Sequence, residues 1–276
     1  MTAVSDPSAL SVPSAQAPSN GAAPVLLSRD GAIATITLNN PRRKNAMTRA
    51  AWRALRAALA EVAASDARVL VVSGAAGDFC AGADLSGAAE ERRPPLVDMT
   101  EVNAACLALH RLPIPTIARV DGVAVGAGMN LALGCDFVVA SSRARFSEIF
   151  VRRGLSVDFG GSWLLPRLIG LHRAKELVLL GEIIDAAQAR ELGLVREVVE
   201  PDELDAAVGR LAERLLAGPP IAMRLSKCML TDSFEASLER ALEDEARSQQ
   251  INFGTEDTAE AGQAFFEKRA PVFRGR

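Results

Sequence analysis

The chain has 276 residues, of which 49% are hydrophobic and 24% are charged, with a formal net charge of -3 at pH 7. This length and apolar content predict a globular protein with a sizeable core, and the slightly acidic balance argues against nucleic acid as a partner. Four cysteines without a C-x-x-C pair and two histidines give no pattern for a metal site. We therefore expect reduced thiols in a cytoplasmic protein and no bound metal.

The first 24 residues differ in composition from the rest of the chain. They are rich in Ala, Ser and Pro, contain no Lys or Arg, and have no continuous apolar stretch. These features argue against a secretory signal or transit peptide and favour a disordered tail over residues 1–24. Later apolar runs stay below the ~18 residues that a membrane span needs, so we expect no membrane association.

Strand and helix patterns alternate along much of the chain. IATITL at residues 33–38 alternates as a half-buried strand does, and a helix with Thr48 as its N-cap follows. The alternation continues with a buried strand at 69–73, a helix at 97–110, a strand at 116–121, a short helix ending near Gly134 and a strand at 137–140. This order predicts an α/β fold, and periodicity alone suggests a doubly wound sheet.

The pattern changes after Pro201, where helical segments follow one another without a strand between them. We therefore expect a core over residues 25–200 and a helical region over residues 201–276. Two pairs of residues have the spacing of helix N-caps, namely Asp185 with Gln188 and Asp257 with Glu260.

Two glycine-rich turns are the best candidates for chemistry. GDFCAGADL at 77–85 follows a buried strand directly, and GVAVGAGMNLALGCD at 122–136 leads into an apolar helix. Small residues let backbone N–H groups approach a ligand, and two such groups converging on one oxygen would form an oxyanion hole. The second turn lacks the Gly-Lys of a phosphate loop and has Leu131 where a dinucleotide fingerprint needs glycine. The remaining alternative is that the glycines serve close helix packing.

Seven motifs occur in order along the chain: NPRRKNAM (40–47), FCAGADL (79–85), the turn at 122–136, ARF (144–146), GGSWLLPRLIG (160–170), DAAQARELGLVREVV (185–199) and FFEKRAPVFRGR (265–276). Together they resemble the crotonase, or enoyl-CoA hydratase/isomerase, superfamily from about residue 25 to the end of the chain. The resemblance implies a crotonase-like spiral of ββα units in place of a doubly wound sheet. It also implies that the C-terminal helical region builds trimers, commonly paired into hexamers.

The resemblance implies an acyl-CoA substrate whose thioester oxygen is held by two backbone N–H groups. Matched motif to motif, these belong to Ala81 and Ala127, and they would stabilise an enolate. The segment Ala81, Gly82, Ala83 and Asp84 would lie along the adenine and pantetheine of CoA. CoA would be part of the substrate, so no separate cofactor is expected.

Other motif residues are implied to bind CoA. Arg42 and Lys44, with Arg43 between them, lie in the turn that family members place near the CoA phosphates, and the same run also fits a solvated loop. Lys268 matches a lysine that reaches CoA from a neighbouring subunit, and Phe265 matches a nearby aromatic residue. A homo-oligomer, either a trimer or a hexamer, would then form part of the binding site.

The acid and base residues depart from the hydratase pattern. Hydratases of the family use two glutamates, and the matching positions here are Asn130 and Phe150, neither of which can transfer a proton. Asp158 aligns instead with an aspartate that some branches use as a base, and burial among apolar neighbours would raise its pKa toward the working pH. Asp158 also fits a helix N-cap facing Gly161. Glu148, two residues before Phe150, is a second catalytic candidate.

These residues favour double-bond isomerisation of an enoyl-CoA, with Asp158 moving the proton. Two alternatives stay open. One is hydration of a 2-enoyl-CoA, with Asp158 or Glu148 in place of the missing pair, and the other is a non-catalytic acyl-CoA-binding protein. The aromatic residues Phe150, Phe159 and Trp163 fit either an apolar acyl pocket or the core.

Overall fold

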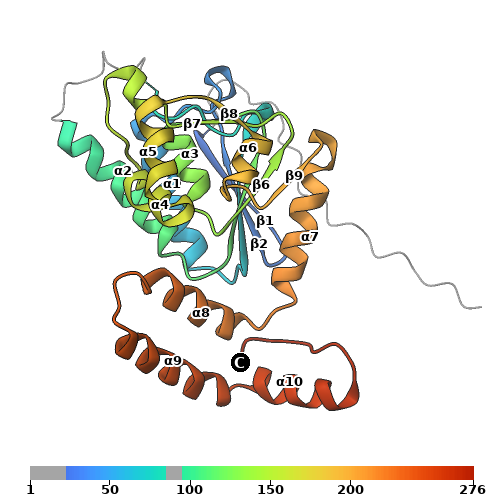
Figure 1. Ribbon diagram of the computed structural model, residues 1–276. Coiled ribbons are helices and arrows are strands. Elements are labelled where there is room, and N and C mark those ends of the chain that lie inside the picture. The colour runs from blue at the N-terminus through green and yellow to red at the C-terminus, as the bar shows by residue number, and fades with distance from the viewer. Residues whose placement is uncertain (1–22, 85–94) are drawn as a thin grey trace, which may run out of the picture.

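The computed structural model describes residues 23–84 and 95–276, so almost all of the predicted tail at 1–24 lies outside the described residues. Its largest element is a six-stranded sheet in the order β1-β2-β3-β4-β6-β9 (Figure 1). β1 and β2 pair antiparallel, and the other neighbours pair parallel. The strands of this sheet are β1 (Val25–Asp30), β2 (Ile33–Leu38), β3 (Val69–Gly74), β4 (Thr116–Val120), β6 (Phe137–Ser141) and β9 (Glu197–Val199).

A second sheet contains three short strands in the order β5-β7-β8. β5 (Val123–Val125) follows β4, β7 (Arg145–Ser147) follows β6, and each of these return strands leads into a helical segment. β8 (Ile184–Asp185) pairs antiparallel with β7. Strand, return strand and helix thus repeat as ββα units, which confirms the fold implied by the resemblance, and the doubly wound sheet is wrong. Strands of two or three residues carry no readable alternation, so periodicity missed them.

Helices cover both faces of the large sheet (Figure 1). Those of the core are α1 (Arg49–Ala63), α2 (Pro95–His110), α3 (Ala127–Leu133), α4 (Gly161–Ile169), α5 (Leu171–Leu180), α6 (Ala186–Glu191) and α7 (Leu204–Leu216), with 3-10 turns η1 (Pro41–Arg43), η2 (Ala75–Gly77), η4 (Ile149–Arg153) and η5 (Pro201–Glu203). In β3, Leu70 and Val72 belong to the main buried cluster, whereas Val69 and Val71 belong to the cluster that α7 closes. A strand that is buried on both faces has apolar residues at consecutive positions, which explains the sequence VLVVS of β3.

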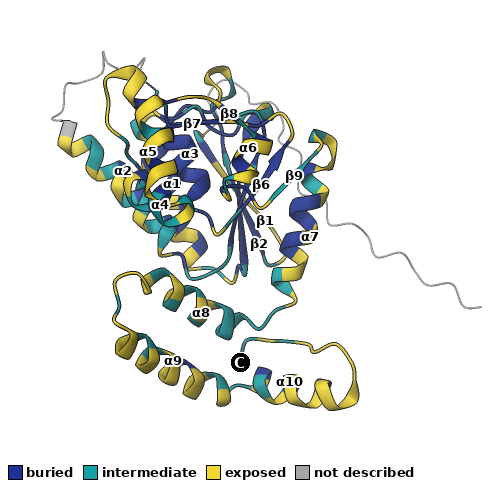
Figure 2. Cartoon of the chain, viewed as in Figure 1, coloured by how far each residue is buried: buried dark blue, intermediate teal, exposed yellow. Residues whose placement is uncertain are grey.

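Three further helices extend below the core in Figure 1, namely α8 (Pro220–Asp232), α9 (Leu238–Phe253) and α10 (Glu256–Glu267). The helical region predicted from residue 201 is thus present, but α7 covers the sheet and the projecting part begins with α8. α8 contains no buried residue and α9 buries only Ser248, so many of their side chains are exposed (Figure 2). Within the described ranges, no helix is both long and apolar enough to cross a bilayer.

Helix caps test the predicted helix starts. Thr48 caps α1, and Asp185 caps α6 in a capping box, both as predicted. The predicted cap formed by Asp257 and Glu260 is wrong, because Thr255 caps α10. The Asp257 carboxylate instead accepts two backbone N–H groups of the C-terminal tail, at 2.6 and 2.9 Å.

Candidate active site

A cavity of about 870 Å³ lies beside the start of α3. Its wall comes from four stretches that are far apart in the sequence, within residues 42–46, 81–84, 123–127 and 149–158. Both glycine-rich turns and the basic run therefore meet at one cavity, whose size is typical of a small-molecule site. Among the described residues, no group of three His, Cys, Asp or Glu is placed to hold a metal ion.

The second glycine turn presents a backbone N–H to this cavity. Gly126 adopts φ 56 and precedes α3, so Ala127 is the first residue of that helix. N–H groups in a first helical turn have no partner within the helix. In the part of the chain that the structure describes, the Ala127 N–H donates to no carbonyl, and Ala127 lines the cavity. This position is compatible with donation to an anionic oxygen.

The first glycine turn differs from the expectation for Ala81. The Ala81 N–H donates to the Lys44 carbonyl oxygen at 2.9 Å, so this structure does not leave it available to a ligand. The backbone of Met47 pairs with the residues on either side of Ala83: the Met47 N–H donates to the Gly82 carbonyl oxygen at 2.8 Å, and the Asp84 N–H donates to the Met47 carbonyl oxygen at 2.9 Å. Because successive N–H groups alternate in extended chain, the Ala83 N–H points away from Met47. Ala83 lines the cavity, and its N–H has no carbonyl partner among the described residues.

Glycines bring the two turns into contact. Gly82 adopts φ 88, and a Cβ atom there would lie 2.8 Å from the Val125 carbonyl oxygen. A Cβ atom at Gly128, in the first turn of α3, would overlap the Cys80 carbonyl oxygen. Larger residues at either position would separate the two turns. These glycines therefore do serve close packing, and this contact brings to one cavity two N–H groups that have no carbonyl partner among the described residues.

Asp158 lies on the cavity wall between η4 and α4. Its backbone carbonyl oxygen accepts the Asn130 side-chain amide at 2.9 Å and the Gly161 N–H at 3.0 Å. Its Oδ1 atom is buried and has no hydrogen-bond partner among the described residues. Burial raises the pKa of Asp158 to about 6. Its side chain does not cap α4, whose N-cap is Gly160, so the alternative N-cap role is wrong.

Glu148 lies behind the cavity wall rather than on it. Its exposed fraction is 0%, and it is absent from the residues that line the cavity. Oε2 of Glu148 accepts the Asn130 side-chain amide at 3.3 Å. Burial, together with the negative charge of Asp158, raises the pKa of Glu148 to about 8. Phe150, two residues later, lines the cavity instead, so the structure does not place Glu148 where substrate would reach it.

The basic run forms one side of the cavity. Arg42, Arg43 and Lys44 all line it. Among the described residues, carboxylates offer them only long ion pairs: the Arg43 guanidinium lies 3.9 Å from Asp84, and the Lys44 ammonium lies 4.0 Å from Asp78. Weak pairing at an exposed site leaves cationic groups able to bind a phosphate. The placement is compatible with the CoA contact implied for Arg42 and Lys44.

Asn45 holds this basic run in place, and the sequence analysis missed it. Lys44 and Asn45 both adopt left-handed backbone conformations, with φ 50 and 57. The buried Asn45 amide donates to the carbonyl oxygens of Ala75 at 2.9 Å and Asp78 at 2.7 Å, and its oxygen accepts the Asn40 N–H at 2.9 Å. Asparagine is enriched at positive φ, so the Lys-Asn pair in NPRRKNAM was the available signal.

The sequence profile described as "Enoyl-CoA hydratase/isomerase" matches residues 28–276. The chain belongs to the enoyl-CoA hydratase/isomerase family. It is 36% identical over 250 residues to the 1,2-epoxyphenylacetyl-CoA isomerase of Escherichia coli, covering 88% of this chain and 95% of that protein. It is 33% identical over 252 residues to the short-chain-enoyl-CoA hydratase of Clostridium acetobutylicum, covering 89% and 95%. The crystal structure of an enoyl-CoA hydratase from Bacillus anthracis superposes with a TM-score of 0.87 at 32% identity, covering 92% of this chain and 100% of that one.

Two residues that the family resemblance assigned to CoA do not reach this cavity within one chain. Phe265 lies in α10 and is 79% exposed, and Lys268 ends the same helix. Neither lines the cavity described above. Their predicted role requires a neighbouring subunit, so it stays a prediction for this member of the enoyl-CoA hydratase/isomerase family.

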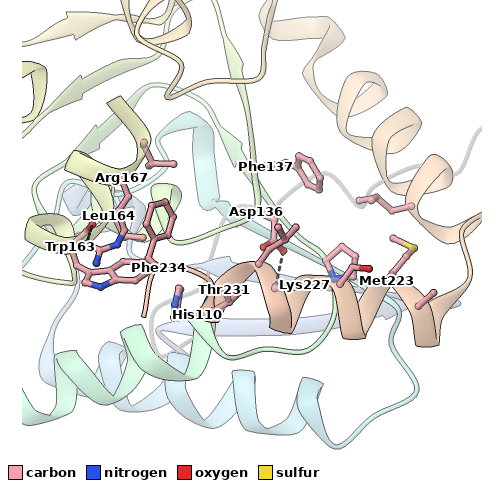
Figure 3. A pocket seen from close by; sticks show the side chains of 16 residues that line it. His110, Asp136, Phe137, Trp163, Leu164, Arg167, Met223, Lys227, Thr231 and Phe234 are labelled. Carbon is pink, nitrogen blue, oxygen red and sulfur yellow. Dashed lines mark hydrogen bonds and ion pairs between the residues drawn. The ribbon is translucent and has the colours of Figure 1, made fainter. Parts of the chain in front are cut away.

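A second cavity of about 620 Å³ lies between α4, the end of α2 and α8 (Figure 3). Trp163 lines it, with the Arg167 guanidinium 4.0 Å above its ring and the His110 ring edge-on at 5.1 Å. Neither glycine-rich turn contributes to this cavity.

Phe159 is fully buried against Trp52, with ring centroids 5.1 Å apart. Of the three aromatic residues considered for an acyl pocket, Phe150 lines the first cavity, Trp163 lines the second and Phe159 is core.

Proposed function

We propose that the protein is an enoyl-CoA isomerase that moves a double bond within the acyl group, with Asp158 as the base. The observation that carries this proposal is the position of Asp158 on the same cavity as two free backbone N–H groups. At the two glutamate positions of the hydratase pattern the chain has Asn130, which is engaged behind the wall, and Phe150. One carboxylate is sufficient for isomerisation, because the proton it removes is the proton it returns.

The N–H groups of Ala127 and Ala83 would donate to the thioester oxygen. This polarises the carbonyl group, acidifies the carbon that carries the proton and stabilises the dienolate that forms. The Asp158 carboxylate takes the proton from one carbon, the electron pair moves through the conjugated system onto the oxygen, and Asp158 returns the proton to a second carbon. No atom is gained or lost. In this proposal the donor in the first turn is Ala83, because the Ala81 N–H is engaged by Lys44.

Asp158→Asn tests the role of the base. Asparagine has nearly the same shape and cannot accept the proton, so we expect isomerisation of a 3-enoyl-CoA to fall by about 10²–10⁴-fold. Binding of a saturated acyl-CoA, which needs no proton transfer, should stay within a few fold of the wild-type value. Unchanged turnover in this variant would exclude Asp158 as the base.

Hydration of a 2-enoyl-CoA is the second candidate, since the Clostridium and Bacillus relatives are named hydratases. The same N–H pair could stabilise that reaction, with Asp158 directing a water molecule. Product analysis separates the two reactions, because hydration yields a 3-hydroxyacyl-CoA and isomerisation yields an isomer of unchanged mass. Tight acyl-CoA binding without either product would favour the non-catalytic alternative.

A further inference from the structure

Two buried polar atoms behind the cavity wall have no partner among the described residues: Oε1 of Glu148 and Oδ1 of Asn130. Both residues have an exposed fraction of 0%. Their side chains already meet, because Asn130 Nδ2 donates to Glu148 Oε2 at 3.3 Å. Each of the two contacting side chains therefore has one polar atom with a partner and one oxygen without a partner among the described residues. Buried polar groups without partners are costly, so this arrangement requires an explanation.

The orientation of the Asn130 amide follows from its other partner. The Asp158 carbonyl can only accept, so Nδ2 faces it at 2.9 Å. The second N–H of Nδ2 is then directed to Glu148. The opposite orientation of the amide would place its oxygen against two acceptors, the Asp158 carbonyl oxygen and Glu148 Oε2. A proton on Oε1 of Glu148 would satisfy both unsatisfied oxygens at once.

The surroundings of Glu148 disfavour its ionised form. In the described part of the chain, no Lys or Arg forms an ion pair with it, and the charge that acts on it is the negative charge of Asp158. α3 faces it with the neutral Asn130. The other charged residues on the adjacent η4 and α5 are exposed: Arg152, Arg153, His172, Arg173, Lys175 and Glu176. An unpaired buried carboxylate is strongly disfavoured, and neutralisation by a proton is the usual outcome.

We propose that Glu148 is a protonated positioning residue: its O–H donates to Asn130 Oδ1 while Asn130 Nδ2 donates back to Oε2, and this acid–amide pair holds the Asp158 backbone. The proposal rests on the proposed role of Asp158 as base. Asn130 then connects Glu148, which lies between β7 and η4, to the segment that leads into α4. Glu148 itself exchanges no proton with substrate, which separates it from a catalytic acid.

Glu148→Gln and Glu148→Ala form the first test. The glutamine amide can donate to Asn130 Oδ1 and accept from Nδ2, so E148Q should preserve kcat within about 2-fold, whereas E148A leaves the amide unpaired. Misplacement of a reacting group costs up to ~10²-fold in rate, so E148A should lower kcat by about 10-fold or more with KM little changed. Wild-type kcat should fall as pH rises through about 8, where Glu148 ionises, and E148Q should lack this fall. Wild-type and E148Q profiles that fall identically would overturn the proposal.

An infrared difference spectrum between wild type and E148Q at pH 7 tests the proton directly, without turnover. We expect the carbonyl band of a protonated carboxylic acid, shifted in heavy water, that is present in wild type and lost in E148Q. A spectrum with only carboxylate bands would overturn the proposal. If E148A does not fold, the infrared spectrum and the E148Q pH profile still test whether Glu148 carries the proton. Full activity of Asp158→Asn would reject the proposed base and leave the infrared result intact, whereas an inactive E148Q would make Glu148 catalytic.

Discussion

Asp158 is held at the cavity by an irregular stretch of backbone. The next residue, Phe159, adopts φ 46, a conformation that is unusual for a bulky side chain. It is stabilised there because its ring is fully buried and stacks on Trp52, 5.1 Å away between ring centroids. Strained residues of this kind persist where the surrounding structure determines them and are concentrated at functional sites. The buried aromatic pair therefore fixes the direction of the base.

The rate of isomerisation should depend on pH through Asp158. Burial raises the pKa of this carboxyl to about 6, and only the ionised form accepts a proton. We therefore expect kcat/KM to rise about tenfold per pH unit below that value and to level off above it. Measurement of kcat/KM from about pH 4.5 to 7.5 tests this expectation. The affinity for a saturated acyl-CoA serves as the control and should vary far less with pH. A kcat/KM that stays constant across this pH range would contradict the role of Asp158 as the base.

At the scale of single residues, the sequence predicts which residues lie near the cavity better than it predicts which of their N–H groups and side chains face it. Asp158 and Ala127 lie on the cavity, as the motifs suggested, because the motifs specify turns next to helix starts. The choice between Ala81 and Ala83 could not be read, since it depends on which of two alternating N–H groups Lys44 and Met47 engage. Nor could the burial of Glu148 be predicted, because it depends on the contact between the turn after β7 and the Asn130 side chain of α3.

At the scale of elements, α3 and α4 are coupled through the first residue of α4. Gly161 packs directly on the Asn130 side chain, and a Cβ atom there would overlap both polar atoms of that amide. Asn130 in turn holds the Asp158 carbonyl. The position of the base thus depends on close contact between two helix starts, which only glycine permits.

Gly161→Ala should therefore impair both stability and activity. The added methyl group displaces the Asn130 amide, and overpacking of this kind costs about 1–3 kcal/mol in the free energy of unfolding. We expect a lower melting temperature and a lower kcat. Gly262→Ala in α10 is the matched control, because no atom lies within 4 Å of a Cβ at that position. Alanine there should stabilise its helix by up to ~1 kcal/mol, so this variant is the control for the free energy of unfolding. If Gly161→Ala were as stable and as active as the wild type, the proposed coupling would be contradicted.

Element types followed from the sequence for several segments long enough to show a period, although the strand β1 and the helix α5 were not predicted. The helix at α1 and the strands β2 and β3 are examples of predicted elements. The return strands β5, β7 and β8 are too short for this, although they separate a spiral of ββα units from a doubly wound sheet. The resemblance to the family supplied that distinction, and the two-sheet topology confirms it.

At the scale of the whole molecule, the projecting helices carry apolar side chains that the described part of the chain leaves exposed. Leu238, Phe253 and Phe265 are 71%, 75% and 79% exposed. Exposed apolar surface of this extent is typical of an interface between protein molecules. We infer that further copies of the chain cover it, which would bring α10 of one subunit toward the cavity of another.

Mixed oligomers test whether Lys268 acts across that interface. Lys268→Ala alone should raise KM for acyl-CoA by about 10- to 100-fold, since a charge-assisted hydrogen bond contributes about 1.5–3 kcal/mol and each 1.4 kcal/mol is about tenfold in affinity. Asp158→Asn alone should be inactive. When the two variants are refolded together, some cavities combine an intact Asp158 from one subunit with an intact Lys268 from its neighbour. Activity at low substrate concentration should then exceed the sum of the two parents.

A matched mixture separates this effect from simple dilution. Lys175 is an exposed lysine on α5. A mixture of Lys175→Ala with Asp158→Asn should therefore show only the activity expected from the Lys175→Ala subunits that it contains. If the Lys268→Ala mixture shows no gain over its parents, Lys268 acts within its own subunit or not at all. In one chain it lies at the end of α10 and does not line the cavity. A gain in the mixture would therefore assign to the neighbouring subunit a binding role that one chain cannot perform alone.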